Sequence, residues 1–173
     1  MKPAFPAFVL LLAGPRLLAS CGPLFVVERS LNANVVVYEL RRAPGGAVDA
    51  KQPVRGHWIM FGEDGRREEL NALEKRLAYG IDVLETVPDG AVIAVRALRD
   101  RRIEVGTSGA CPSATTLIQG RPALLRRVFV QLGSGGLIPS VSYVVLHGAD
   151  RATGALVEER VDGAGRTEPA NGR

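Results

Sequence analysis

Beyond residue 20 the chain consists of short runs in which apolar and polar residues alternate, separated by turn-forming residues. In the run 35–41, Val36, Tyr38 and Leu40 share one face, as a strand with one solvated side requires. The Pro-Asp-Gly sequence at 88–90 favours a hairpin, because proline presets one backbone angle and glycine permits another. The pattern predicts nine to ten strands, at 24–28, 35–41, 56–61, 81–86, 91–98, 102–105, 115–119, 124–132, 142–146 and 156–161.

One segment has a helical pattern. Asn71 and Glu74 have the spacing of a capping box, in which each side chain bonds the backbone N–H of the other residue. Leu73 and Leu77 lie four residues apart, so they form an apolar stripe that we expect to pack on a sheet. Gly80 is expected to end the helix with a positive φ angle.

This helix has an alternative start near Asp64, because Arg66 to Glu69 also form helix readily. Few other helical patterns are present, so parallel crossover units would lack their connecting helices. We therefore predict a mainly β fold, an antiparallel sandwich or barrel with one short packed helix. A single β-rich domain is expected over 21–162, between a leader (1–20) and a disordered tail (163–173).

The leader has the features of an export signal. Lys2 precedes an apolar run from residue 4 to 14, and the sequence Leu18-Ala19-Ser20-Cys21 follows. This arrangement resembles the signal peptide of bacterial lipoproteins. The resemblance implies cleavage before Cys21 and acylation of this cysteine, for example with palmitate, as a membrane anchor. Gly22 stands where an inner-membrane retention signal would place aspartate, so the resemblance implies the outer membrane, facing the periplasm.

Two features of the leader leave an alternative open. Pro6 interrupts the apolar run and Arg16 separates it from the cleavage motif, so an ordinary secretory signal could release a soluble periplasmic domain. A membrane-spanning helix is not expected, because the uninterrupted run is about half the roughly 20 residues needed. In the lipoprotein case the acyl chains would supply the anchoring.

The cysteine count and the charge limit the domain further. If Cys21 is acylated, Cys111 has no partner and no intrachain disulfide can form. The net charge of +4 falls to about +2 once Lys2 and Arg16 leave with the leader, and the arginine pairs are spread along the chain. We expect no nucleic-acid partner, and solvated arginines or a modest attraction to anionic lipid headgroups instead.

Three stretches, VVERSLNANVVVY (26–38), QPVRGHWI (52–59) and LEKRLAYGI (73–81), together resemble the domain of unknown function 4833 family. The similarity covers nearly the whole mature domain. The family has no established activity, so the resemblance implies a type of domain and no chemistry.

The same stretches hold the most polar constellation in the chain. A helix packed near the Asn32 turn and the Trp58 strand would line a pocket that combines a stacking surface with positive charge. Such a pocket would suit an anionic or sugar-bearing envelope ligand. In the alternative, Glu74 caps its helix, Trp58 and Tyr79 fill the core, and Lys75 and Arg76 are solvated. The candidate ligand-binding residues are Asn32, Asn34, His57, Trp58, Glu74, Arg76 and Tyr79.

We therefore predict a lipid-anchored envelope protein with a binding or interaction domain for an anionic ligand or an envelope protein. We expect no catalytic residue, cofactor or metal ion. The alternative is a periplasmic hydrolase or metal-assisted enzyme that uses His57 or His147, although neither histidine has a second metal ligand at a recognisable spacing. A structural role in envelope assembly is a third possibility.

Overall fold

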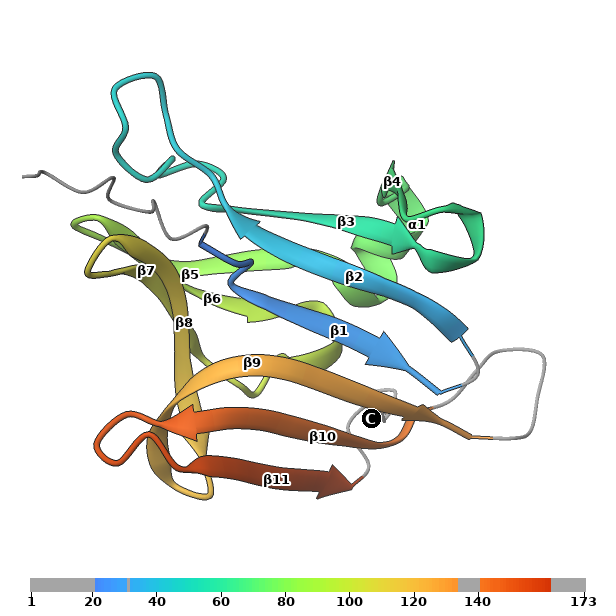
Figure 1. Cartoon of the computed structure of the whole chain (residues 1–173). Helices are drawn as coiled ribbons and strands as arrows, with labels where there is room; N and C mark the ends of the chain where they lie inside the picture. Colours follow the sequence, from blue (N-terminus) through green and yellow to red (C-terminus); the bar gives the residue numbers. More distant parts are fainter. Residues whose placement is uncertain (1–20, 31, 134–140, 163–173) are drawn as a thin grey trace, which may run out of the picture.

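The computed structural model describes residues 21–30, 32–133 and 141–162, so the predicted leader and tail lie outside the described residues. The mainly β fold with one short helix is confirmed (Figure 1). The strands are β1 (Phe25–Arg29), β2 (Asn32–Leu40), β3 (Val54–Met60), β4 (Arg66–Glu69), β5 (Ile81–Val87), β6 (Gly90–Val95), β7 (Ile103–Ser108), β8 (Cys111–Ile118), β9 (Arg121–Leu132), β10 (Val141–Asp150) and β11 (Leu156–Asp162). The helical elements of the described part are α1 (Ala72–Glu74) and the short turns η1 (Phe61–Glu63), η2 (Lys75–Tyr79) and η3 (Arg96–Leu98).

The strands form one curled sheet in the order β4-β3-β2-β1-β9-β8-β7-β6-β5, and β10 and β11 branch off beside β9 (Figure 1). β1 and β9 run parallel, and the other ladders are antiparallel. The sheet is therefore mixed, although mainly antiparallel. Within the described residues, β4 and β5 are the two ends of the long path and do not pair with each other. The curled sheet therefore stays open along a seam, with the β4–β3 end of the path on one side and β5 on the other.

The concave side of this sheet holds the core. Val36, Tyr38 and Val128 are fully buried there, as the alternation in β2 predicts. Tyr38 stacks on Phe25 with ring centroids 4.6 Å apart, and its hydroxyl donates a 3.0 Å hydrogen bond to the carbonyl of Tyr79. Burial of each such side chain contributes about 1.5–3 kcal/mol.

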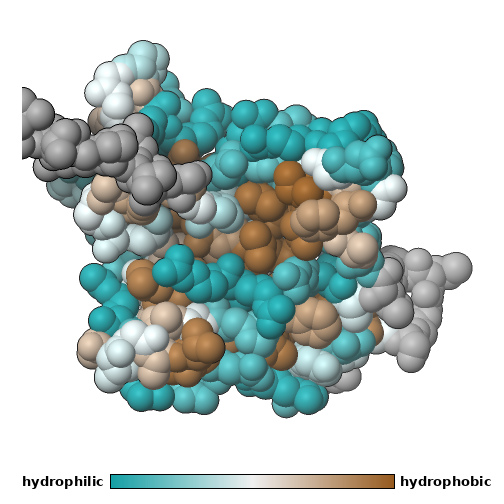
Figure 2. Space-filling model, in the orientation of Figure 1, coloured by the Kyte–Doolittle hydropathy of each residue, from teal (hydrophilic) through white to brown (hydrophobic). Residues whose placement is uncertain are grey.

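On the convex side, Figure 2 shows an apolar area between more hydrophilic bands, over the region where β1 and β2 lie. Half-buried Val26 and Val37 are register partners there, and Val35 is opposite Ile59. The alternation of β2 thus places valines on both faces, with the larger buried side chains inside.

The capping box is confirmed. Asn71 Oδ1 accepts a 2.9 Å hydrogen bond from Glu74 N–H, and Glu74 Oε2 accepts one of 2.9 Å from Asn71 N–H. After α1 the chain continues as a π-helical turn, η2 (Lys75–Tyr79).

The helix ends at Gly80 as predicted, but the predicted packing of the apolar stripe and the positive φ angle of Gly80 are wrong. Leu73 and Leu77 are 59% and 63% exposed, whereas Tyr79 is buried. The Leu73 and Leu77 side chains therefore both point away from the sheet, and Tyr79, at the end of the π-turn, is the side chain that packs into the core. Gly80 has a φ of −64°, and it serves close approach instead, because a Cβ there would lie 2.0 Å from the carbonyl oxygen of Lys75.

The possible helical start near Asp64 is also wrong, because Arg66–Glu69 forms strand β4. It pairs with β3 from His57↔Glu69 to Met60↔Arg66. All four of its side chains are exposed and charged, which is a common way to protect a sheet edge from aggregation.

A disulfide joins Cys21 to Cys111, with a Cα–Cα distance of 5.3 Å. The expectation that no intrachain disulfide can form is therefore wrong for this structure. The cause is tertiary: the fold brings the first described residue against the start of β8, 90 positions away. Among the described residues, none of the helices is long and apolar enough to cross a membrane.

Candidate functional site

Three of the predicted site residues meet at Trp58. Its Nε1–H donates a 3.1 Å hydrogen bond to Glu74 Oε1, and its ring meets the Tyr79 ring edge to face at 5.2 Å. Trp58 and Tyr79 are only 6% and 8% exposed. Glu74 thus caps its helix with one oxygen and holds the indole with the other, while both rings fill the core.

Arg29 joins this group, although no local signal in the sequence marks it. Its guanidinium carbon lies 4.8 Å from the centroid of the Trp58 ring and 5.7 Å from that of Tyr79. Its buried Nε has no hydrogen-bond partner in the described part of the chain. Burial raises the pKa of Tyr79, and the positive charge of Arg29 opposes that shift.

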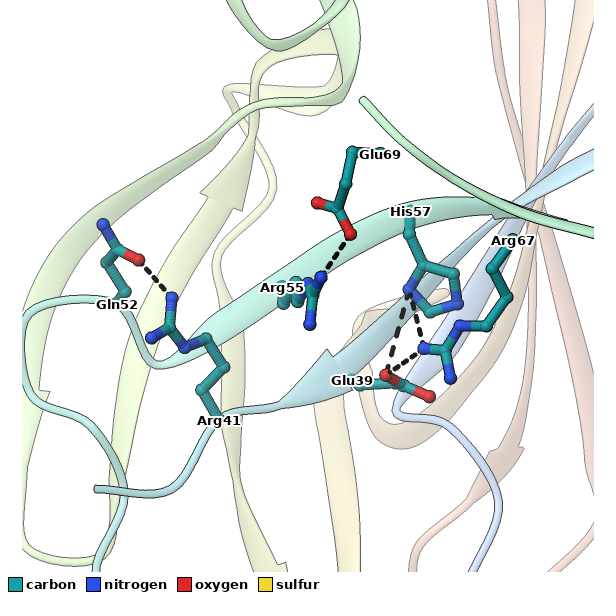
Figure 3. Close-up of polar contacts among 7 residues, drawn as sticks. All are labelled: Glu39, Arg41, Gln52, Arg55, His57, Arg67 and Glu69. Atoms are coloured by element: carbon teal, nitrogen blue, oxygen red, sulfur yellow. Dashed lines mark hydrogen bonds and ion pairs between the residues drawn. The ribbon is translucent and has the colours of Figure 1, made fainter. Parts of the chain in front are cut away.

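His57 lies on the opposite face of β3 from Trp58 and is 2% exposed. Arg67 Nη2 is 3.3 Å from His57 Nδ1, and Arg67 also pairs with Glu39 at 2.7 Å (Figure 3). Because arginine can only donate, Nδ1 is the acceptor and the ring proton resides on Nε2. Burial, together with the charge of Arg67, lowers the pKa of His57 below its ordinary value of 6.5.

This lowered pKa predicts a pH dependence of stability. The unfolded chain takes up the proton first as the pH falls below about 6.5, so the contribution of His57 is present above that pH and is lost below it. We expect the free energy of unfolding of the wild type to fall more steeply from pH 7 to pH 5 than that of His57→Gln. Urea denaturation across this range measures both slopes, and parallel slopes would contradict the prediction.

Asn32, Asn34 and Arg76 are not part of the cluster formed by Trp58, Glu74, Tyr79 and Arg29, which we call the Trp58 group. In the part of the chain that the structure describes, their hydrogen bonds go to other residues. Asn32 Oδ1 accepts a 2.8 Å bond from Asn34 N–H, and Asn34 Oδ1 accepts one of 3.5 Å from Gly62 N–H. These amides therefore fix turns at one end of the β1–β3 sheet. Arg76 is exposed, and its carbonyl accepts a 3.3 Å bond from Arg96.

His57 and His147 do not come together. They lie on β3 and β10, with β2, β1 and β9 between them, a separation of roughly 19 Å at normal strand spacing. His147 accepts from Arg127 at Nε2 (3.2 Å), and its Nδ1 is 3.1 Å from Glu158 Oε2. Within the ranges that the structure describes, no three His, Cys, Asp or Glu side chains are grouped as metal ligands.

A pocket of about 340 Å³ opens in the seam between β3 and β5, and we call it the seam pocket. Residues 54–56 of β3 form one wall, Ile81 and Val83 of β5 the other, and Tyr79 and Gly80 lie between them. Of the predicted site residues, only Tyr79 lines it. The complete lining is Arg41, Lys51, Gln52, Pro53, Val54, Arg55, Gly56, Glu69, Leu70, Lys75, Tyr79, Gly80, Ile81, Val83 and Arg96.

The lining of the seam pocket is basic, with five cationic side chains and one carboxylate, Glu69. Arg55 pairs with Glu69, and Gln52 accepts a hydrogen bond from Arg41 (Figure 3). The hydrogen bond and the ion pair between Arg55 and Glu69 lower the pKa of Glu69.

The remaining cations of the pocket differ in their pairing. Arg41 and Arg96 have acidic partners outside the lining, Asp49 at 3.6 Å and Asp82 at 3.1 Å. Lys51 and Lys75 have no ion pair within 4 Å among the described residues. Their charges still act at longer range on Asp49 and Glu69, whose pKa values they help to lower, but neither lysine is held in a close ion pair. Sequence reasoning missed this site because its cations come from separate segments between residues 41 and 96.

Comparison with known proteins gives a single finding. Neither the curated proteins nor the solved structures contain a match to this chain. A family model described as Domain of unknown function (DUF4833) matches residues 25–160, which include every strand except the end of β11. The chain therefore belongs to the DUF4833 family.

Proposed function

We propose that this protein is a non-catalytic binding domain of the cell envelope that takes an anionic ligand in the seam pocket. The observation that carries the proposal is the charge of the pocket, in which five cations face one carboxylate. Partial enclosure strengthens the attraction between these cations and an anion, because the effective dielectric constant there is lower than in water.

The lining favours binding over hydrolysis. Its carboxylate, Glu69, is hydrogen-bonded to Arg55 and has a lowered pKa, which makes it a weak general base near neutral pH. The buried His57 is held by Arg67 on the outer face of β3 and does not line the pocket.

Location in the envelope is supported by the disulfide, because such bonds persist in oxidising compartments such as the periplasm. The lipid anchor on Cys21, at the outer membrane, stays part of the proposal, but it competes with the disulfide. One sulfur can carry a thioether or a disulfide bond, so each molecule has one or the other. An unacylated Cys21 would correspond to a domain released into the periplasm.

Binding of simple anions tests the proposed pocket. We expect succinate or inorganic phosphate to bind saturably, and Lys51→Gln/Lys75→Gln to weaken that binding about tenfold or more, since each lost charge removes roughly 1 kcal/mol. Isothermal titration calorimetry at constant ionic strength measures this. Arg126→Gln/Arg151→Gln is the matched control, because it removes two exposed charges outside the lining.

The control variant should bind like the wild type. Equal affinity of the wild type and the lysine variant, or no saturable binding by the wild type, would contradict the proposal.

A further inference from the structure

The seam pocket lies between two strand edges that lack partners. β4 pairs with β3 only from His57 to Met60, so residues 54–56 extend beyond its end. On the other wall β5 pairs with β6, and within the described part of the chain nothing pairs with its second edge. Both free stretches line the pocket.

The backbone of β5 presents hydrogen-bonding groups to this space. Arg96 N–H donates a 2.9 Å bond to the carbonyl of Gly80, and the ladder continues as Ile81↔Val95 and Asp82↔Ala94. In an antiparallel pair the bonded and non-bonded positions alternate, so Gly80 and Asp82 bond to β6. The N–H and C=O groups of Ile81 and Val83 therefore point to the free edge, where both residues line the pocket.

The side chains of β5 differ from those of β4, because its two acidic residues, Asp82 and Glu85, are paired with Arg96 and Arg102 and its other exposed side chains are largely apolar. Val83, Leu84 and Val87 are 40%, 47% and 36% exposed. The opposite end of the sheet, β4, has four exposed charged side chains instead. An edge strand with exposed apolar side chains and unpaired backbone groups is a template for the addition of another strand.

We propose that the ligand of the seam pocket is an extended acidic peptide segment that adds as a strand to the free edge of β5. This inference rests on the proposed function and specifies the chemistry of its ligand. Ile81 and Val83 supply main-chain hydrogen bonds, and Lys51 and Lys75 attract the carboxylates. Successive side chains of an added strand point to opposite faces, so alternating acidic and apolar residues fit a wall that has both cations and exposed valines.

The test uses the purified protein and an end-blocked octapeptide of alternating glutamate and valine. A second peptide of the same sequence is N-methylated at alternate positions, which retains the charge but removes the N–H donors facing β5. We expect the first peptide to bind and the N-methylated one to bind at least about tenfold more weakly, because two or more main-chain hydrogen bonds are lost. Amide hydrogen exchange at Ile81 and Val83 should slow when the first peptide is added.

A Val83→Pro variant gives a second measurement. Proline removes the outward N–H of this edge position while leaving the bonds to β6, so we expect an unchanged fold and weaker peptide binding. If both peptides and succinate bind equally well without protecting these amides, strand addition is wrong while the anion pocket stands. If succinate and phosphate bind but the octapeptide does not, strand addition is again wrong. If none of the anions bind, the proposed function itself fails.

Discussion

Cys111→Ser is expected to lower the free energy of unfolding by about 2–4 kcal/mol under non-reducing conditions. The disulfide to Cys21 closes a loop with a sequence separation of 90, and such a loop restricts the unfolded chain strongly. Without the bond, the segment before β1 is free to leave the start of β8. Urea denaturation of the wild type and the variant, each with and without reductant, measures the loss.

The matched control is Cys21→Ser. If the disulfide is the stabilising element, the two single variants and the double variant should have the same stability, because each breaks the same bond. If Cys21 carries lipid in the native protein, Cys111→Ser isolated from membranes should unfold like the wild type. Mass spectrometry of the native N-terminus distinguishes the two states directly, since acyl chains add mass and a disulfide removes two hydrogens.

Trp58→Ala is expected to cost about 3–5 kcal/mol, the range for removal of a large buried aromatic side chain. The indole packs against Tyr79 and lies under the Arg29 guanidinium, so its loss leaves a cavity beside a half-buried cation. It also removes the donor to Glu74 Oε1, which ties the capped helix to β3. Because the chain has a single tryptophan, unfolding is followed by far-ultraviolet circular dichroism.

Two further variants separate these contributions. Trp58→Phe keeps an aromatic ring but loses the Nε1–H, and we expect an intermediate loss of stability. Leu77→Ala truncates an apolar side chain of the same helix that is 63% exposed, so its effect should stay within about 0.5 kcal/mol. A loss at Leu77 as large as that at Trp58 would mean that the predicted stripe, and not the Trp58 group, holds the helix.

Structural features that depend on neighbouring residues were predicted well from the sequence. The capping box at Asn71 and Glu74 was confirmed because all its groups lie within one turn of the chain. The alternation in residues 35–41 identified β2, and the Pro-Asp-Gly turn identified the β5–β6 hairpin. Each of these features depends on neighbouring residues whose preferences agree with the fold.

Other features depended on strand pairing and packing, which the local sequence pattern does not show. Arg66–Glu69 has helix-forming composition, yet pairing with the edge of β3 made it a strand. The close approach of Gly80 to the Lys75 carbonyl accompanies a π-turn in which Leu77 is exposed and Tyr79 is buried. In both cases tertiary packing outweighed a local preference of a few tenths of a kcal/mol per residue.

The sequence alone therefore determined that this protein is mainly β, with one capped helix and strand boundaries near those observed, because apolar alternation and turn chemistry act over a few residues. Only the tertiary structure decided that Cys21 meets Cys111, that Arg29 covers Trp58, and that the barrel stays open at a basic seam. Those features join segments tens of residues apart, and their positions follow from the order and curvature of the strands, which no local pattern encodes.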